Sequence, residues 1–199
     1  MHDDHTPSPW MTRHVGLVPA KLTLLDVACG HGRHAKQFAR RGVLVTAVDI
    51  DGAALASLRG FAGINAERRD LENYPWPYAP ESFDCILVCN YLFRPNTEAM
   101  LASLKPGGLL LYETFMSGQE RFGKPSRPEH LLRPNELMQW VHGSFNAFAY
   151  EQQPERDADG KPIAAKQKIA AYKFAKQAPV ELSADAQALA SATETPAQE

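Results

Sequence analysis

The chain has 199 residues, and its 44% hydrophobic and 22% charged content is that of a folded domain with a sizeable core. Its formal net charge of −2 gives no global electrostatic footprint for nucleic acid or anionic lipid. No apolar run approaches the ~20 residues that span a bilayer, and the polar segment 1–5 does not resemble a signal peptide. Three cysteines do not indicate a disulfide framework, so we expect a reducing, cytoplasmic location.

Strand-like and helix-like segments alternate through the first half of the chain. Ser8 and Pro9 are typical of the N-cap and first turn of a short helix. Apolar, β-rich segments then predict strands at 22–28, 43–48, 83–89 and 109–114, and the polar segment 65–69 is a plausible short strand among them. Helices are expected at 31–41, 51–59 and 97–104, and a turn at 105–108. This alternation predicts an α/β fold with a parallel sheet and helices on both faces.

The pattern changes after residue 114. A polar stretch at 117–133 precedes a predicted helix at 134–141. Two further strands, at 145–151 and 167–174, flank a loop rich in Pro, Asp and Gly. Their hairpin would make the last strand of the sheet antiparallel. We therefore expect an N-terminal segment at 1–21, one domain at 22–176 and a disordered tail at 177–199, where Ala, Ser, Thr, Glu and Gln dominate.

A glycine-rich turn follows the first predicted strand. Its pattern is Gly30-x-Gly32-x-x-Ala35, and it opens the next helix. Glycines allow a sharp turn and let a ligand approach the backbone, while the helix start directs free amides toward that ligand. In an open α/β sheet such a ligand lies beyond the carboxyl ends of the strands. The motif therefore predicts where a binding site lies but does not identify the ligand.

Asp49 ends the second predicted strand, 19 residues after Gly30. A carboxylate at this position can accept both ribose hydroxyls of an adenosine ligand. It serves NAD and S-adenosylmethionine equally well. The alternative role, a simple helix N-cap, is one that Asp51 already suits.

Asp26 discriminates between NAD and S-adenosylmethionine as the expected ligand. It lies four residues before Gly30, where an added carboxylate would repel the pyrophosphate of a dinucleotide. S-adenosylmethionine has no phosphate and carries a cationic amino group and a sulfonium. Residues 25–35, Leu-Asp-Val-Ala-Cys-Gly-His-Gly-Arg-His-Ala, resemble the first motif of class I S-adenosylmethionine-dependent methyltransferases.

Later landmarks follow the order of that family. Asp70-Leu71 resembles its adenine-binding pair, and Lys105-Pro106-Gly107-Gly108 its turn before the fifth strand. Segments 90–95 and 130–137 are similar to those of small bacterial tellurite-resistance-type methyltransferases. The resemblance implies a single-domain, Rossmann-like methyltransferase fold with a mostly parallel seven-stranded sheet and an antiparallel last strand. It implies S-adenosyl-L-methionine as cofactor, bound by Asp26, Ala28, Gly30, Gly32, Asp49, Ile50, Asp70, Leu71 and Cys89.

The sequence defines less well the part of the site that would bind the methyl acceptor, which we call the acceptor half. In this fold the residues after the fourth strand face the transferring methyl group, which here assigns Asn90 and Tyr91 to acceptor positioning. Tyr91 could instead be an ordinary aromatic of the pocket wall. Arg121 and Arg127 could belong to a lid that recognises an anionic acceptor. Alternatively, the segment that holds them is an ordinary solvated loop, which is the more common situation for exposed charged residues.

Other functions fit parts of the same sequence pattern. His31 and His34 have a spacing that a metal could use, but no third ligand cluster is evident, so we predict no metal site. An NAD-dependent oxidoreductase fits Gly30, Gly32 and Asp49 but not Asp26. A non-catalytic adenosyl-binding protein on the same fold is the second alternative. The short chain and its net charge favour a small-molecule methyl acceptor over nucleic acid.

Overall fold

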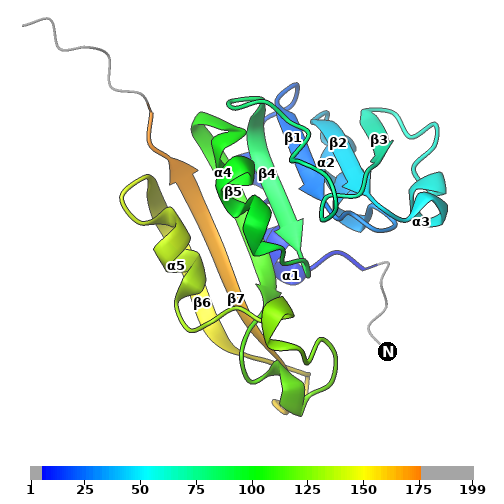
Figure 1. The fold of residues 1–199 in the computed structure, drawn as a ribbon. Helices are drawn as coiled ribbons and strands as arrows, with labels where there is room; N and C mark the ends of the chain where they lie inside the picture. Colours follow the sequence, from blue (N-terminus) through cyan, green and yellow to red (C-terminus); the bar gives the residue numbers. More distant parts are fainter. Residues whose placement is uncertain (1–5, 176–199) are drawn as a thin grey trace, which may run out of the picture.

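The computed structural model describes residues 6–175, and its strands form one seven-stranded sheet in the order β3-β2-β1-β4-β5-β7-β6 (Figure 1). Between the strands lie helices and four 3₁₀ turns, the latter at Val15–Leu17, Arg94–Asn96, Gln119–Arg121 and Pro128–His130. The helices are α1 (Pro9–His14), α2 (Arg33–Ala39), α3 (Gly52–Ala56), α4 (Thr97–Ala102) and α5 (Glu136–Val141). The strands are β1 (Thr23–Val27), β2 (Leu44–Asp49), β3 (Ile64–Arg68), β4 (Phe83–Cys89), β5 (Leu104–Phe115), β6 (Phe145–Arg156) and β7 (Pro162–Lys173).

The directions of the strands confirm the predicted α/β sheet. β1 to β5 pair in parallel, whereas β7 is antiparallel to both β5 and β6. In Figure 1 the arrowheads of β1 and β4 accordingly point opposite to that of β7. The strand order reverses between β1 and β4, so the edge at which these two strands end is where ligands bind in such sheets.

The hairpin of β6 and β7 is longer than the sequence pattern indicated. Pairing continues beyond residue 151 to Arg156 and begins again at Pro162, so the predicted loop is mostly strand. Pro154 does not interrupt it, because β6 is an edge strand and its outer side needs no ladder hydrogen bond. Asp157 shapes the tip by accepting hydrogen bonds from the backbone N–H groups of Asp159 and Lys161. The predicted tail at 177–199 lies outside the described residues.

One helix and one turn differ from the prediction. The helix expected from residue 31 begins at Arg33, because Gly30 and Gly32 both adopt left-handed backbone angles. The segment 105–108 is a bulge inside β5 rather than a separate turn, since Leu104 already pairs with Phe83 and the register shifts afterwards. Both differences arise from backbone geometry at glycines, which hydrophobic periodicity does not encode.

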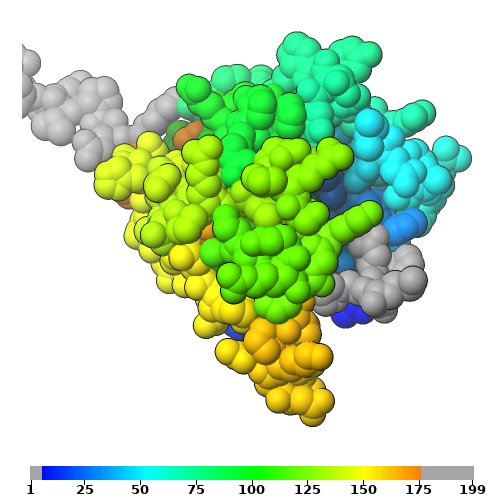
Figure 2. All heavy atoms as spheres, turned by 60° about the horizontal axis from the view of Figure 1, so that its bottom comes forward, coloured from blue at the N-terminus to red at the C-terminus, as the bar shows by residue number. Residues whose placement is uncertain are grey.

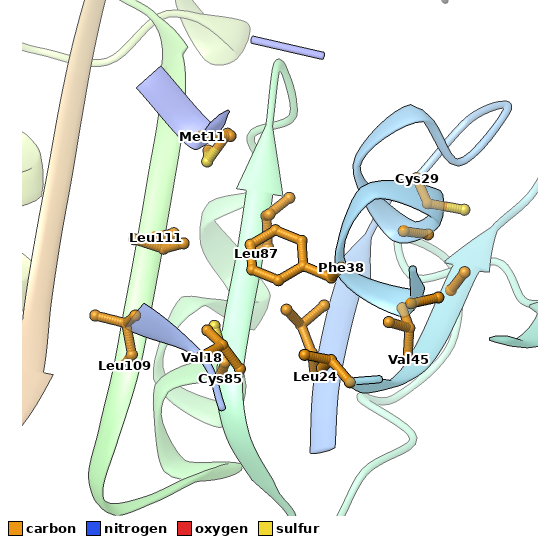
Figure 3. Close-up of a cluster of buried hydrophobic side chains, with 14 of the residues drawn as sticks. Met11, Val18, Leu24, Cys29, Phe38, Val45, Cys85, Leu87, Leu109 and Leu111 are labelled. Atoms are coloured by element: carbon orange, nitrogen blue, oxygen red, sulfur yellow. The ribbon is translucent and has the colours of Figure 1, made fainter. Parts of the chain in front are cut away.

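Side chains alternate between two cores, one on each face of the sheet. The first core joins α1, α2 and the residues around α3 to the sheet, and Figure 3 shows Met11, Phe38, Leu24 and Leu87 within it. The second core lies under α4 and α5, which contribute residues such as Met100 and Leu137. This arrangement confirms the prediction of helices on both faces.

The N-terminal segment is fixed to the sheet by polar contacts as well as by Trp10 and Met11, which are buried. Ser8 occupies the N-cap position of α1, but its hydroxyl does not cap the helix as predicted. The hydroxyl donates to the Glu113 carboxylate, and the Ser8 N–H donates to Nε2 of His34 at 3.0 Å. These two hydrogen bonds satisfy the polar groups of Ser8 and tie the N-terminal segment to β5 and α2. None of the described helices is long and apolar enough to cross a membrane.

Gly32 is required by both its backbone and its surroundings. Its φ is +67°, and a Cβ placed there would lie 2.4 Å from Cδ2 of Leu58, which is 1% exposed. We expect Gly32→Ala to destabilise the protein by roughly 2–5 kcal/mol, combining the left-handed penalty with overpacking of the core. Urea unfolding measures this free energy.

Gly30→Ala is the matched control, because Gly30 has a φ of +55° but open space where a Cβ would lie. It should cost only about 1–2 kcal/mol, the left-handed penalty alone. Equal losses for the two variants would contradict the proposed contact with Leu58.

Candidate cofactor and acceptor site

The turn after β1 exposes backbone at the edge where β1 and β4 end. Ala28, Gly30 and Gly32 all have positive φ, of 52°, 55° and 67°. Only a small residue tolerates such a sequence of left-handed positions at low cost. Because a Cβ at Gly30 would meet no heavy atom within 4 Å, the space beside this turn is open. The open backbone fits a cradle for a bound ligand.

Asp26 lies beneath this turn rather than on its surface. Its side chain is 1% exposed, and Oδ2 accepts a hydrogen bond of 3.0 Å from the Ala35 N–H in the first turn of α2. Burial raises the pKa of Asp26 to about 7, while the Ala35 hydrogen bond and the Arg33 charge act to lower it. The carboxyl group therefore changes charge near neutral pH and ties β1 to α2.

Asp49 ties β2 to the same turn. Its Oδ2 accepts from the Gly30 N–H at 2.7 Å, and its Oδ1 accepts from the Asp51 N–H at 2.9 Å. Asp51 caps α3 as predicted, because its side chain accepts from the N–H groups of Ala53 and Ala54. The N-cap role that could have explained Asp49 is thus taken by its neighbour. Asp49 is left at the open edge beside the glycine turn.

Asp70 and Leu71 follow β3 in a tight turn. The Asp70 carboxylate accepts from the N–H groups of Glu72 and Asn73 and from the Asn73 side-chain amide. The hydrogen bonds from Asn73 make the largest contribution to lowering the pKa of Asp70, so its carboxyl group is ionised at neutral pH. Leu71 is buried, and its carbonyl accepts a hydrogen bond from the Asn96 side chain. The turn is held in place from two sides.

A cavity of about 360 Å³ joins these strand ends. It brings together six residues that the sequence assigned to the site, namely Ala28, Asp49, Ile50, Asp70, Leu71 and Tyr91. Asp26, Gly30, Gly32, Cys89, Asn90, Arg121 and Arg127 do not line it. Three lining residues, Arg69, Glu72 and Asn73, were not predicted from the sequence. Their position directly beside Asp70-Leu71 was the signal that could have identified them.

Tyr91 lines this cavity, and its side chain holds a buried polar atom. Its hydroxyl oxygen is buried and has no hydrogen-bond partner. Burial raises the pKa of Tyr91, and the nearby Glu72 carboxylate adds to the effect, so the phenol stays protonated. A buried hydroxyl without a partner is uncommon in proteins. Its position at the cavity fits a group that completes its hydrogen bonding with a ligand.

Cys89 and Asn90 lie beside Tyr91 at the end of β4. Burial raises the pKa of the Cys89 thiol to about 12, so the thiol is neutral, and Sγ lies 3.5 Å from Nη2 of Arg33. Asn90 has a φ of +59° and is exposed, and its N–H donates to the Glu113 carbonyl. The left-handed turn at Asn90 directs the chain from β4 toward the cavity.

The segment 117–133 covers the neighbouring part of the same edge. In Figure 2, which brings the bottom of Figure 1 forward, this green segment lies between the yellow to orange hairpin and the blue to cyan half of the sheet. Arg121 and Arg127 are exposed on it, as the solvated-loop alternative expects. Their assignment to an acceptor lid stays a prediction.

Sequence reasoning also missed the contact that holds this segment. Arg94, after β4, forms two hydrogen bonds with the Glu136 carboxylate, of 2.6 and 2.8 Å, and further bonds with the carbonyls of Glu129 and Leu131. Bidentate arginine–carboxylate pairs combine strength with fixed geometry. The two segments that resembled tellurite-resistance-type enzymes, 90–95 and 130–137, are therefore parts of one structural contact.

His34 is accounted for by structure. Burial lowers the pKa of His34 to about 3, so the ring is neutral and its Nε2 accepts the Ser8 N–H. Within residues 6–175 no cluster of three or more His, Cys, Asp or Glu side chains is arranged to hold a metal ion.

Comparisons with known proteins agree with this geometry. Residues 24–108 match the family model of a methyltransferase domain. The ubiquinone biosynthesis O-methyltransferase of Pseudomonas fluorescens is 32% identical over 114 residues, which cover 53% of this chain and 48% of that protein. The chain thus matches about half the length of this curated relative.

Two solved structures share the fold at low sequence identity. TehB from Haemophilus influenzae has a TM-score of 0.67 and 19% identity, with 82% of this chain and 61% of that chain covered. A putative S-adenosylmethionine-dependent methyltransferase from Listeria monocytogenes has a TM-score of 0.63 and 14% identity, with coverages of 82% and 96%. Residues 24–108 are thus similar in sequence to a methyltransferase domain, and the solved structures share the fold of this chain.

Proposed function

We propose that this chain transfers a methyl group from S-adenosyl-L-methionine to a small-molecule acceptor. The observation that carries the proposal is the cavity at the strand ends, which Asp49, Asp70-Leu71 and Tyr91 line together. The open backbone at Gly30 borders the same edge. We further propose that residues 22–176 form the catalytic domain, with 1–21 as its N-terminal segment.

The cofactor half would be held by groups that the sheet already fixes. Asp49 would accept the ribose hydroxyls and Asp70-Leu71 would contact the adenine, with Ala28 and Ile50 as apolar walls. Asp26 would face the cationic amino group from beneath the turn, since its carboxyl group accepts from the Ala35 N–H in the first turn of α2. When bound, S-adenosylmethionine supplies a methyl group on a sulfonium that a nucleophile can displace in line.

The chain's own part in the reaction is alignment and exclusion of water. Tyr91 would orient the acceptor through its hydroxyl, and Asn90 would do so from the next position of the same turn. Orientation of reacting groups alone can lower a barrier by ~7–11 kcal/mol. A general base is required only where the acceptor nucleophile is protonated at working pH.

The nature of the acceptor is a further part of this proposal. The net charge of −2 and the exposed, scattered arginines of 117–133 favour a small molecule over nucleic acid. Arg121 and Arg127 remain candidates for contact with an anionic acceptor. The three cysteines are all free thiols, which supports a reducing, cytoplasmic location.

The first prediction concerns ligand choice. S-adenosylhomocysteine should raise the melting temperature of the protein and NAD should not, because the buried Asp26 carboxyl disfavours a pyrophosphate.

Asp49→Asn should weaken S-adenosylhomocysteine binding roughly tenfold or more, by removing a charged acceptor from the ribose. Asp51→Asn is the control and should bind normally, since Asn is an equally good helix cap. Stabilisation by NAD alone would overturn the proposed function in favour of an oxidoreductase, and failure to bind any adenosyl ligand would also overturn it.

A second prediction concerns pH. Since burial raises the pKa of Asp26 to about 7, the free protein must release a proton there before the carboxylate faces a cationic amino group. The charged form is favoured above that pKa, so affinity for S-adenosylhomocysteine should rise with pH, by about tenfold from pH 6 to pH 8. Isothermal titration calorimetry at both pH values measures this change.

The Asp26→Asn variant serves as the reference for this pH dependence. It keeps an oxygen that can accept from the Ala35 N–H but cannot titrate. Its affinity should be lower and should vary less with pH. The same tenfold rise in this variant would assign the titration to another group.

A third prediction concerns Tyr91. Its hydroxyl is buried without a partner in the free protein, so Tyr91→Phe should stabilise that state by about 1 kcal/mol in urea unfolding. Tyr112→Phe should do the opposite, because the Tyr112 hydroxyl donates to the Tyr91 carbonyl at 2.9 Å. If Tyr91→Phe proved clearly less stable than the natural protein, the hydroxyl would be structural and not reserved for a ligand.

A further inference from the structure

Charge is distributed unevenly between the two edges of the sheet. The cavity lies at the edge where β1 and β4 end, and its lining includes the carboxylates of Asp49, Asp70 and Glu72. We call the opposite edge, where the parallel strands begin, the amino edge. Four exposed cations lie there, in the connections that lead into β1, β2 and β3, namely Lys21, Arg40, Arg41 and Arg59. The formal net charge of −2 averages over both edges and therefore conceals this difference.

These four cations are available to an outside partner. None of them forms an ion pair with another described residue, and the guanidinium of Arg40 instead lies over the Phe61 ring, 5.6 Å from its centre. The described acidic residues of the amino edge are Asp84, which is paired with Lys105 at 2.9 Å, and the exposed Glu81. The amino edge therefore carries a net positive charge.

Exposed apolar side chains gather at the same edge. Leu44, the first residue of β2, is 52% exposed, and Phe174, directly after β7, is 53% exposed. Leu17 and Tyr172 are also exposed, and both line one hollow of about 130 Å³. In Figure 1 the amino edge faces the top, opposite to the arrowheads of β1 and β4.

Backbone contacts join the basic and the apolar side chains into one surface. The Lys21 N–H donates to the Gly42 carbonyl, beside Arg41, and the Leu44 N–H donates to the Leu22 carbonyl. Leu22 in turn lines the same hollow as Tyr172. The cations of the connections into β1 and β2 thus adjoin the exposed apolar residues from β2 to β7.

We propose that the amino edge binds the surface of an anionic lipid membrane. Such a surface attracts Lys and Arg by its charge and takes up exposed Leu, Phe and Tyr side chains at the boundary of its apolar layer. A nucleic acid would use the cations but would gain little from the leucines. A hollow of about 130 Å³ is also small for a ligand pocket, which favours a broad, flat partner.

This attachment has a consequence for the orientation of the protein. The cavity lies at the edge opposite to the proposed membrane surface. A docked protein would therefore keep the cavity open to water and to dissolved small molecules. The inference does not depend on the proposed function, because it concerns residues that line no part of the cavity.

Co-sedimentation of the full chain with lipid vesicles tests the proposal. Vesicles of phosphatidylcholine alone are compared with vesicles that contain phosphatidylglycerol as about 40% of the lipid. We expect the partition coefficient to be about 30-fold or more higher for the anionic vesicles, because each cation near such a surface contributes roughly fivefold. Raising the salt concentration from about 0.1 M to about 0.5 M should reverse most of this gain, because it shortens the screening length.

Variants separate this surface from a general effect of charge. Arg40→Gln/Arg41→Gln should lower partitioning into anionic vesicles about 10- to 30-fold, through the loss of two cations. Leu44→Thr keeps a residue that suits a strand but removes exposed apolar area, and it should lower partitioning about three- to tenfold. The matched control, Lys124→Gln/Lys161→Gln, removes two exposed cations at the opposite edge and should partition like the natural protein. Melting temperatures establish that each variant is folded.

The remaining outcomes decide against the proposal. Equal partitioning of the natural protein into both kinds of vesicle, or into neither, would overturn it. So would a loss for the control as large as that for Arg40→Gln/Arg41→Gln. A parallel titration with the single-stranded RNA poly(U) covers the other anionic partner. Binding of poly(U) that Arg40→Gln/Arg41→Gln abolishes, together with vesicle binding that Leu44→Thr leaves unchanged, would assign the amino edge to nucleic acid instead.

Discussion

The site depends on one constraint, which is the short left-handed passage from β1 into α2. Two carboxyl groups hold this passage in place. Asp26 accepts a hydrogen bond from the Ala35 N–H, and Asp49 accepts one from the Gly30 N–H. Gly32 lets α2 pack against Leu58, and Gly30 leaves its backbone open to the cavity edge. Without these two anchors the turn would be free to relax toward ordinary backbone angles, and the strand ends would not share one cavity.

The same anchors show how far sequence could predict the structure. Most of the parallel strands were predictable because each is a short apolar segment between glycine or aspartate signals, and Asp26, Asp49 and Asp70 could be placed because they lie at or close to strand ends. Arg94 and Glu136 were not predictable as partners, since they are 42 residues apart and meet only through tertiary packing. The extent of β6 and β7 was missed because Pro154 and the Asp157 turn resemble a loop in sequence while the edge position of β6 tolerates them.

The polar groups of the site fall into two kinds in the described structure. Asp49 and Asp70 are already bonded to backbone N–H groups, so their orientation is set before any ligand arrives. Such preorganisation reduces the free energy lost on binding, because few rotamers remain to be fixed. The Tyr91 hydroxyl is different, since it is buried and unsatisfied. The groups proposed to bind the cofactor thus have their geometry built in, whereas the Tyr91 hydroxyl, proposed to orient the acceptor, still lacks a partner.

This division has a consequence for specificity. The matching family model covers residues 24–108 and ends before the segment 117–133, and the curated relative matches only about half of its own length. The sheet carries the residues that line the cavity, whereas the segment 117–133 is attached by Arg94, through Glu136 and two backbone carbonyls, and by backbone hydrogen bonds such as that from the Leu132 N–H to the Phe115 carbonyl. Substitutions at its exposed positions can therefore change the surface beside the cavity without disturbing the turn at Asp26 and Gly30. Similarity across the first half of the chain accordingly supports the proposed cofactor but not the proposed acceptor, which has to be identified from the second half.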